Sequence, residues 1–208
     1  MQTYRKGFFL FISFFVWIGC QAPSYARKAG KFDRDCFKRF VPDFRTQWYK
    51  ATIDVTGKHF SGLLLFKSFG DSVTRVVFTS EAGTTFFDFE FGARRNKVNF
   101  ILPQINKGPV IRTLQNDLYL VLMRYERDPK ATLLVDQDSK YLQVPRGRKT
   151  IYLVTSDDCQ HLKSIREEWG GKKKVEVTLG GYTAGVPDSI SITHFNFNMQ
   201  INLRKLQQ

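Results

Sequence analysis

The sequence predicts a β-dominated α+β fold in which a curled antiparallel sheet surrounds one long apolar helix. Apolar and polar residues alternate with period two over most of the chain, which indicates half-buried strands. Short Gly-containing turns separate these segments, as between consecutive antiparallel hairpins. One stretch, 109–125, instead repeats its apolar residues every three or four positions, which is the helical period. Since long antiparallel sheets commonly curl, we expect the helix to fill the curl.

The N-terminus has the pattern of an export signal. A short positive segment precedes an apolar run, residues 8–18, that is short for a bilayer span. Gly19 directly before Cys20 resembles the bacterial lipobox, so we expect cleavage after residue 19 and acylation of Cys20 as the lipid anchor. Two alternatives stay open at this point: cleavage after the small-x-small segment 24–26, which gives a secreted protein, and an uncleaved anchor.

Length and charge limit the domain organisation and the partners. The signal is expected to span 1–19, a lipidated tether 20–31 and a single β-rich domain 32–208. The formal net charge of +13 becomes +11 once Arg5 and Lys6 leave with the signal. Because an exported protein seldom meets nucleic acid, and because the basic residues are scattered, we expect a membrane surface as partner and no nucleic acid. A monomer is expected.

The first half of the domain is expected to be a β-meander. The expected strands are 49–56, 60–66, 73–78, 85–91 and 98–102. In the fourth strand Phe87, Phe89 and Phe91 share one face, and Asp88 and Glu90 lie on the opposite face, which we interpret as solvated.

The expected helix, 109–125, begins with Pro109 in the first turn, where proline is tolerated. Its second half, Leu118 to Met123, is apolar on nearly all sides, so we expect it to lie in or across a core.

Strands are expected to return after the helix. Their ranges are 131–136, 141–144, 150–155, 175–179 and a long last strand, 189–203. The apolar residues of the last strand change face part-way, so a β-bulge near Thr193 and His194 is predicted to restore the register. That register places Phe195 and Phe197 on the apolar face.

The export signal, the curled sheet, the apolar helix, the sequence WIGC that ends at Cys20 and the phrase HFSGLLLFKSF (59–69) together resemble the bacterial lipoprotein-localisation family, LolB-like outer-membrane lipoproteins and LolA-like periplasmic carriers. The resemblance implies an unclosed barrel that holds an acyl chain. It also implies a location at the outer membrane facing the periplasm, rather than soluble in the periplasm or secreted. The implied partners are membrane lipid or an acyl chain, and a periplasmic lipoprotein carrier.

On this interpretation the apolar stripes line a cavity. The candidate cavity residues are Phe87, Phe89, Phe91, Leu118, Leu122, Phe195 and Phe197. An ordinary filled core explains the same stripes, and the alternative function is then a structural or interaction lipoprotein that docks on an envelope component.

Phe69 stands at a hairpin turn, where polar residues are usual. LolB-like proteins carry an exposed apolar residue on a protruding loop that inserts into the membrane. The resemblance therefore implies membrane insertion by Phe69, with Lys67 and Arg75 facing anionic headgroups; the alternative is a ring that folds back on the sheet.

The sequence contains no set of residues that predicts an enzyme, a cofactor or a metal site. His59, His161 and His194 have no partner at ligand spacing, and Asp88 with Glu90 is the nearest approach to a carboxylate pair.

Two cysteines remain when Cys20 is assigned to the anchor. In an exported protein Cys36 and Cys159 are candidates for a disulfide, and two buried thiols are the alternative.

Overall fold

The structure, a computed structural model, describes residues 33–207 except Asp71 and Arg94. The expected signal (1–19), the tether (20–31), its anchor Cys20 and Phe32 lie outside the described residues. The described part forms one twelve-stranded antiparallel sheet. Its strands are β1 (Thr46–Val55), β2 (Lys58–Phe69), β3 (Val73–Thr79), β4 (Thr85–Phe91), β5 (Asn96–Ile101), β6 (Thr132–Val135), β7 (Ser139–Arg146), β8 (Lys149–Ser156), β9 (Leu162–Trp169), β10 (Lys172–Thr183), β11 (Val186–His194) and β12 (Met199–Lys205). The helices are α1 (Asp35–Lys38), α2 (Gly108–Val121) and the 3₁₀ turns η1 (Pro103–Ile105) and η2 (Arg124–Arg127).

The strand order is β5-β4-β3-β2-β1-β12-β11-β10-β9-β8-β7-β6. Every neighbouring pair is a sequential hairpin except β1 and β12, which join the two ends of the chain in the middle of the sheet. The two edge strands, β5 and β6, flank α2 in the sequence, so the helix carries the chain from one edge of the sheet to the other. The edges do not pair, and the sheet is an unclosed barrel.

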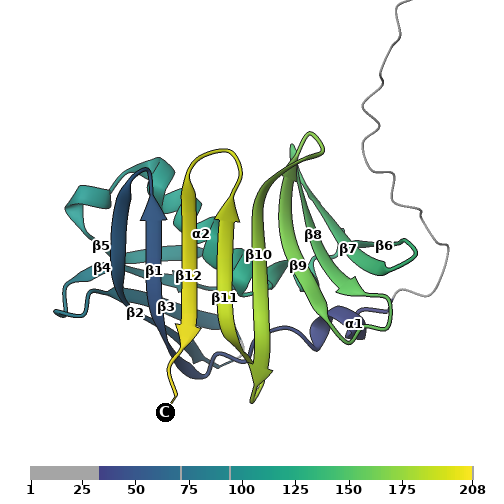
Figure 1. Cartoon of the computed structure of the whole chain (residues 1–208), viewed down its shortest axis with the longest axis horizontal. Coiled ribbons are helices and arrows are strands. Elements are labelled where there is room, and N and C mark those ends of the chain that lie inside the picture. The colour runs from purple at the N-terminus through teal and green to yellow at the C-terminus, as the bar shows by residue number, and fades with distance from the viewer. Residues whose placement is uncertain (1–32, 71, 94, 208) are drawn as a thin grey trace, which may run out of the picture.

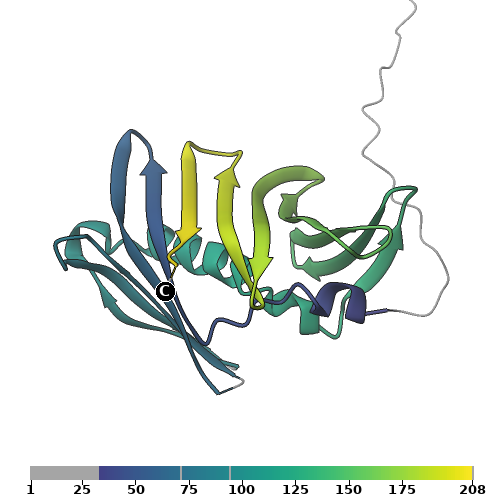
Figure 2. The same ribbon diagram turned by 60° about the horizontal axis from the view of Figure 1, so that its bottom comes forward.

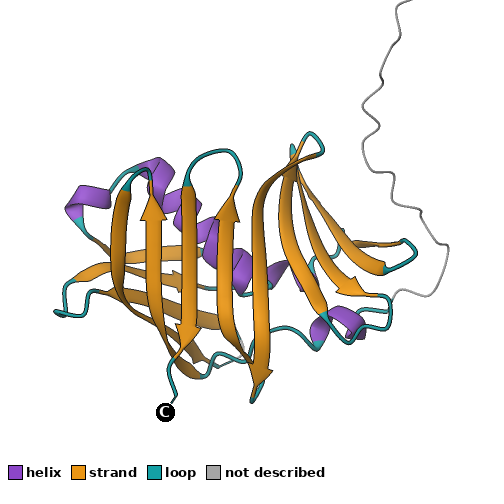
Figure 3. Ribbon diagram, in the orientation of Figure 1, coloured by secondary structure: helices purple, strands orange, loops and turns teal. Residues whose placement is uncertain are grey.

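The sheet curls around α2, which lies diagonally across its concave face (Figure 1). In the turned view, β3 to β5 and β6 to β8 lie on either side of the helix (Figure 2). Figure 3 shows that strands make up most of the regular secondary structure in the described part of the chain. The expected β-dominated fold with one long helix is therefore confirmed, with two more strands than the sequence predicted.

Strand alternation explains most of the sheet. In β1, Tyr49, Ala51 and Ile53 are buried and face the helix, while Lys50 and Asp54 are exposed. Gly62 in β2 has a special role: a Cβ atom there would lie 1.9 Å from the backbone oxygen of Thr79, so only glycine allows β3 to come this close.

Two predictions for the C-terminal half are wrong. The strand β9 was missed, because LKSIREEW contains few apolar residues and four charged ones. The long last strand is instead a hairpin, β11 and β12, with its loop at 195–198. The change of apolar face that we ascribed to a bulge at Thr193 and His194 is produced by this turn.

The helix α2 is shorter and more polar than expected. It ends at Val121, and Met123 has φ of 49°, a left-handed conformation that helps to end the helix. Its first half carries exposed Arg112, and its middle carries Asp117, which is fully buried. No helix in the described part of the chain is long and apolar enough to cross a membrane.

Candidate functional site

The inner face of the sheet is an apolar lining. Each strand from β1 to β4 and from β7 to β12 contributes inward side chains to one continuous cluster that includes α2. From β4 come Phe87, Phe89 and Phe91, and from the helix and its end come Leu118 and Leu122; all five are buried. The cavity candidates at these positions thus do lie together in the interior.

Around the phenylalanine rings of β2 and β4 this interior is filled by side chains rather than hollow. The rings of Phe87 and Phe89 stack with centroids 4.6 Å apart, and Phe44 stacks on Phe66 at 4.2 Å. Such close ring contacts are those of a packed core. A ligand under α2 has to displace side chains or the helix itself.

Phe195 and Phe197 do not belong to this lining. They lie in the β11–β12 loop, where Phe195 is 50% and Phe197 37% exposed. The prediction that both face the cavity rested on reading 189–203 as one strand, and it is corrected by the hairpin.

Polar contacts hold α2 against the sheet. Nε2 of His194 on β11 lies 2.9 Å from Oδ2 of Asp117, and both side chains are buried. Beside this pair, Asn116 of α2 donates a hydrogen bond to Glu167 of β9 at 3.0 Å, and Lys149 donates to the same carboxylate at 2.8 Å. The centre of the helix is therefore attached by a small polar cluster inside an apolar interior.

Asp117 is the residue of this cluster whose burial is least well compensated by hydrogen bonds. Burial raises the pKa of Asp117, and the nearby His194 opposes that shift. Its Oδ1 atom has no hydrogen-bond partner among the described residues. An unsatisfied buried oxygen costs free energy, so this is a point of weakness in the attachment of the helix.

This cluster was not predicted from the sequence, where His194 was noted only at the supposed bulge and as a histidine without a partner at ligand spacing. The available signal was a carboxylate within an apolar helical stretch, but its partner is 77 residues away in the sequence.

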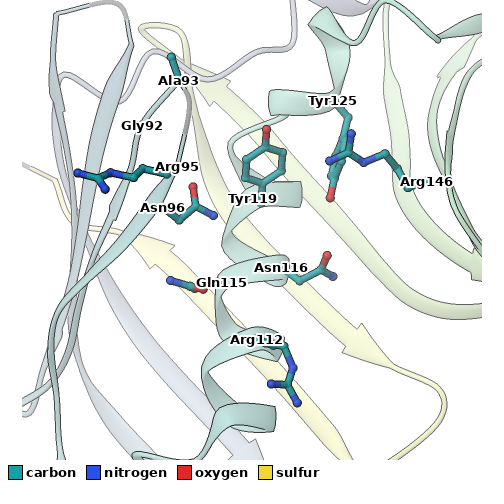
Figure 4. Close-up of a pocket in the computed structure, with 10 residues that line it drawn as sticks. All are labelled: Gly92, Ala93, Arg95, Asn96, Arg112, Gln115, Asn116, Tyr119, Tyr125 and Arg146. Carbon is teal, nitrogen blue, oxygen red and sulfur yellow. The ribbon is translucent and has the colours of Figure 1, made fainter.

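Two clefts open beside the helix. One, of about 370 Å³, lies between α2 and the β5 side of the sheet. Figure 4 shows its polar lining, with Gln115, Asn116 and Tyr119 on the helix and Asn96 across from them. Its three arginines, Arg95, Arg112 and Arg146, are spread apart and do not converge on one point (Figure 4). This arrangement does not form a compact anion site.

The second cleft, of about 440 Å³, lies at the C-terminal end of the helix. Its lining includes Phe44, Leu122 and Met123, which are all buried, together with Ser68 and Gly70 of the β2–β3 hairpin. Here open space reaches the apolar interior.

Phe69 lies at the tip of the same hairpin and is 49% exposed. Nζ of Lys67 lies 5.3 Å from the centre of its ring. The ring is therefore not folded into the sheet. Arg75, which we expected to face headgroups beside it, is instead held by Asp88.

The expectation that Asp88 lies on a solvated face is wrong. Asp88 is buried, and it accepts hydrogen bonds from Arg75 at 2.8 Å and from Asn99 at 3.3 Å. The hydrogen bond from Arg75 is the main cause that lowers the pKa of Asp88. The contact ties β3, β4 and β5 together on the outer face.

Cys36 and Cys159 form a disulfide. It joins α1 to the turn between β8 and β9, across 123 residues of sequence. Arg39 adds a hydrogen bond to the Cys159 carbonyl oxygen at 3.2 Å. The segment around α1 is thus fixed to the β8–β9 turn, in the C-terminal half of the sheet. Among the described residues, no group of three His, Cys, Asp or Glu side chains is placed to hold a metal ion.

Two solved structures have a similar arrangement. One is a LolA superfamily protein from Nitrosomonas europaea, with a TM-score of 0.50 and 9% identity over 84% of this chain and 91% of that chain. The other is a domain assigned to outer membrane lipoprotein sorting from Vibrio parahaemolyticus, with a TM-score of 0.51 and 8% identity over 84% of this chain and 88% of that chain.

The fold is LolA-like. No protein-family model matches the sequence, and no curated protein matches it significantly. The LolA-like resemblance expected from the sequence is therefore confirmed at the level of fold, by structures that share few identical residues with this chain.

Proposed function

We propose that this protein is a non-enzymatic lipoprotein that binds an acyl chain of a lipid or of another lipoprotein beneath α2. The observation that carries the proposal is an unclosed, apolar-lined barrel covered by a single helix whose centre is attached through Asp117, His194 and Glu167. The LolA superfamily and lipoprotein-sorting assignments of its structural neighbours support a lipoprotein-related role.

Binding requires the helix to move away from the sheet. The polar cluster limits the cost of that movement, because its charged groups regain water when they separate. An acyl chain then replaces the helix against the apolar lining, and each methylene it buries contributes about 0.8 kcal/mol. In the unliganded protein the helix occupies the place against the apolar lining that the acyl chain takes on binding.

We further propose that Cys20 carries the lipid anchor and that the domain faces the periplasm from the outer membrane. The partners are then membrane lipid and a periplasmic lipoprotein carrier. Support comes from the signal-like N-terminus, from Gly19 before Cys20 and from the LolA-like fold.

A photoactivatable palmitate analogue tests acyl binding and locates it. The labelled peptides should contain Phe87–Phe91 or Leu118–Leu122, and excess palmitate should suppress the labelling. The chain supplies its own control in a small apolar cluster on the outer face of the sheet, which consists of Leu134, Tyr141, Tyr152 and Val154. Labelling of that outer cluster alone, or no labelling that palmitate suppresses, contradicts the proposal.

The second candidate function is a structural or interaction lipoprotein that docks on an envelope component. The close stacking of Phe87 on Phe89 and of Phe44 on Phe66 favours it, because it shows a core that is complete without ligand. Native mass spectrometry separates the two functions: the purified protein carries a bound lipid mass only if it is an acyl binder.

A further inference from the structure

Five hairpin turns gather at one end of the sheet. The pairing places the turns β3–β4, β1–β2, β11–β12, β9–β10 and β7–β8 along this end in that order. The last four form the upper edge in Figure 1, and the β2–β3 turn with Phe69 lies at the opposite end. The two ends of the sheet are therefore distinct surfaces.

Exposed aromatic side chains are concentrated at this upper end. Trp169 is 49% exposed, Phe195 50% and Phe197 37%. Among the described residues only seven large hydrophobic side chains are exposed, and these three belong to two neighbouring turns. Hairpin turns are normally polar, and neither the sheet core nor the helix needs these rings.

Lysines lie beside two of the three rings, Trp169 and Phe195. Trp169 pairs across strands with Lys172, and the backbone N–H of Phe195 donates to the carbonyl oxygen of Lys174 at 2.9 Å. Between them Nζ of Lys173 lies 4.4 Å from the centre of the Phe195 ring. The six residues Trp169, Lys172, Lys173, Lys174, Phe195 and Phe197 lie in and beside these two neighbouring turns, and we call this set the aromatic–basic rim.

The charge of the rim is neutralised only in part, since Glu168 pairs across strands with Lys173 while Lys172 and Lys174 have no such partner among the described residues. Lys173 pairs with Glu176 at 2.9 Å, but in the described part of the chain no carboxylate pairs with Lys172 or Lys174. The turns 147–148, 170–171 and 195–198 contain no acidic residue, and Arg148 adds a further positive charge in the next turn.

We infer that the aromatic–basic rim is a docking surface for a membrane rich in anionic phospholipid. Aromatic rings with an apolar body favour the interface of a bilayer, and lysines beside them are attracted to anionic headgroups. The rim has both components at one end of a rigid sheet. The basic balance of the chain, +11 without the expected signal, adds long-range attraction to the same partner.

The rim also borders the attachment of the helix. The rings of Phe197 and His194 lie 4.6 Å apart, and His194 holds Asp117 of α2. A docked rim therefore places the membrane next to the helix that covers the interior. The inference does not depend on acyl binding, because it rests only on exposed and half-buried residues outside the apolar lining.

Quenching of Trp169 fluorescence by brominated lipid tests the inference directly. The Cys20→Ala protein is mixed with vesicles of brominated phosphatidylcholine that contain or lack phosphatidylglycerol, and the signal of the Trp169→Phe variant is subtracted to isolate Trp169. We expect a blue shift and quenching with the anionic vesicles and little of either with phosphatidylcholine alone. Absence of both changes at saturating anionic lipid overturns the inference.

Co-sedimentation with the same vesicles, without bromine, compares the membrane binding of matched variants with that of the parent protein. On the Cys20→Ala background, Trp169→Ser combined with Phe195→Ser should weaken binding by about tenfold or more, and added salt should weaken binding of the parent protein. Phe69→Ser, at an equally exposed ring on the opposite end, tests the membrane contact that the LolB-like resemblance implies, and it should bind like the parent when the rim is the contact. If Phe69→Ser loses binding and the double variant does not, the membrane contacts the β2–β3 tip and the rim assignment is wrong. Because the rings of Trp169, Phe195 and Phe69 are each about half exposed, the melting temperatures of the variants should stay near that of the parent.

Discussion

Nε2 of His194 and Oδ2 of Asp117 lie 2.9 Å apart, in a hydrogen bond between the sheet and the helix that crosses it. Neither side chain is accessible to water, and the interior around them is apolar. This pair decides how α2 responds to acid and to mutation.

The first prediction concerns pH. Because burial raises the pKa of Asp117, the folded state holds this proton more tightly than the unfolded state does. The contribution of this group to stability is therefore largest below the ordinary Asp pKa of about 3.9, and it is lost as pH rises through the raised value. Compared with Asp117→Asn, the wild type should gain in melting temperature as pH falls from neutral toward 4.

Comparison with Asp117→Asn cancels the ionisable groups that do not interact with Asp117. His194, Glu167 and Lys149 interact with its carboxylate, so the measured difference reports Asp117 together with these partners. A difference in melting temperature that stays constant, or that shrinks on acidification, contradicts the assignment.

Removing one partner of the pair should cost more than removing both. His194→Leu leaves a buried carboxylate without its partner, and we expect a loss of about 3–5 kcal/mol in the free energy of unfolding. Asp117→Leu together with His194→Leu should recover most of that loss, since two apolar side chains replace the pair. Urea denaturation of the two variants provides the values, and equal destabilisation of both would show that the carboxylate is not the source of the cost.

Gly62 should tolerate no side chain. The Cβ of alanine would lie 1.9 Å from the backbone oxygen of Thr79, and a backbone atom cannot give way as a side chain does. Gly62→Ala should therefore lower the free energy of unfolding by about 3 kcal/mol. The exposed neighbour Ser61 provides the control, because Ser61→Ala should change it by less than about 0.5 kcal/mol. A stable Gly62→Ala protein would mean that β3 is free to move away.

The disulfide should be a major contributor to stability. It closes a loop of 123 residues, for which the chain-entropy model gives on the order of 4–5 kcal/mol. Cys36→Ser and Cys159→Ser should each lower the melting temperature, and the double variant should resemble the singles. Thiol counting on unfolded, unreduced wild type checks the bond itself; reactive Cys36 and Cys159 would contradict it.

The anchor prediction is independent of the fold. Cys20→Ala should abolish incorporation of labelled palmitate and release the protein from the membrane fraction, because acyl chains bury far more apolar surface than exposed rings do. Sequencing of the mature N-terminus is the second measurement. A wild-type protein that begins at Arg27 and takes up no palmitate contradicts lipidation.

The sequence predicted the parts of the fold that depend on local pattern. Alternation in β1 and β4 and the helical period after Pro109 correspond to the observed elements, because burial on one face produces those periods directly. The strand β9 escaped prediction since its inward residues include Glu167, which is satisfied by Lys149 and Asn116 rather than by apolar neighbours.

The site was predicted only in part. Phe87, Phe89 and Phe91 were assigned to the interior from their shared face, whereas Phe195 and Phe197 were misplaced by a turn that contains no glycine or proline. Contacts between distant residues, such as Asp117 with His194 or Asp88 with Arg75, depend on how the sheet curls. No local period in the sequence records that curl.

The central position of the β1–β12 pair has a consequence for biogenesis. The chain can form two local meanders, β1 to β5 and β6 to β12, while it is being synthesised, but Tyr49 cannot meet Lys205 until the last residues are available. Contacts of such high sequence separation form late and slow the folding of a domain. On the proposal that the protein is exported, a secretion machinery that threads the unfolded chain from its N-terminus receives a polypeptide whose sheet is completed only once β12 is available.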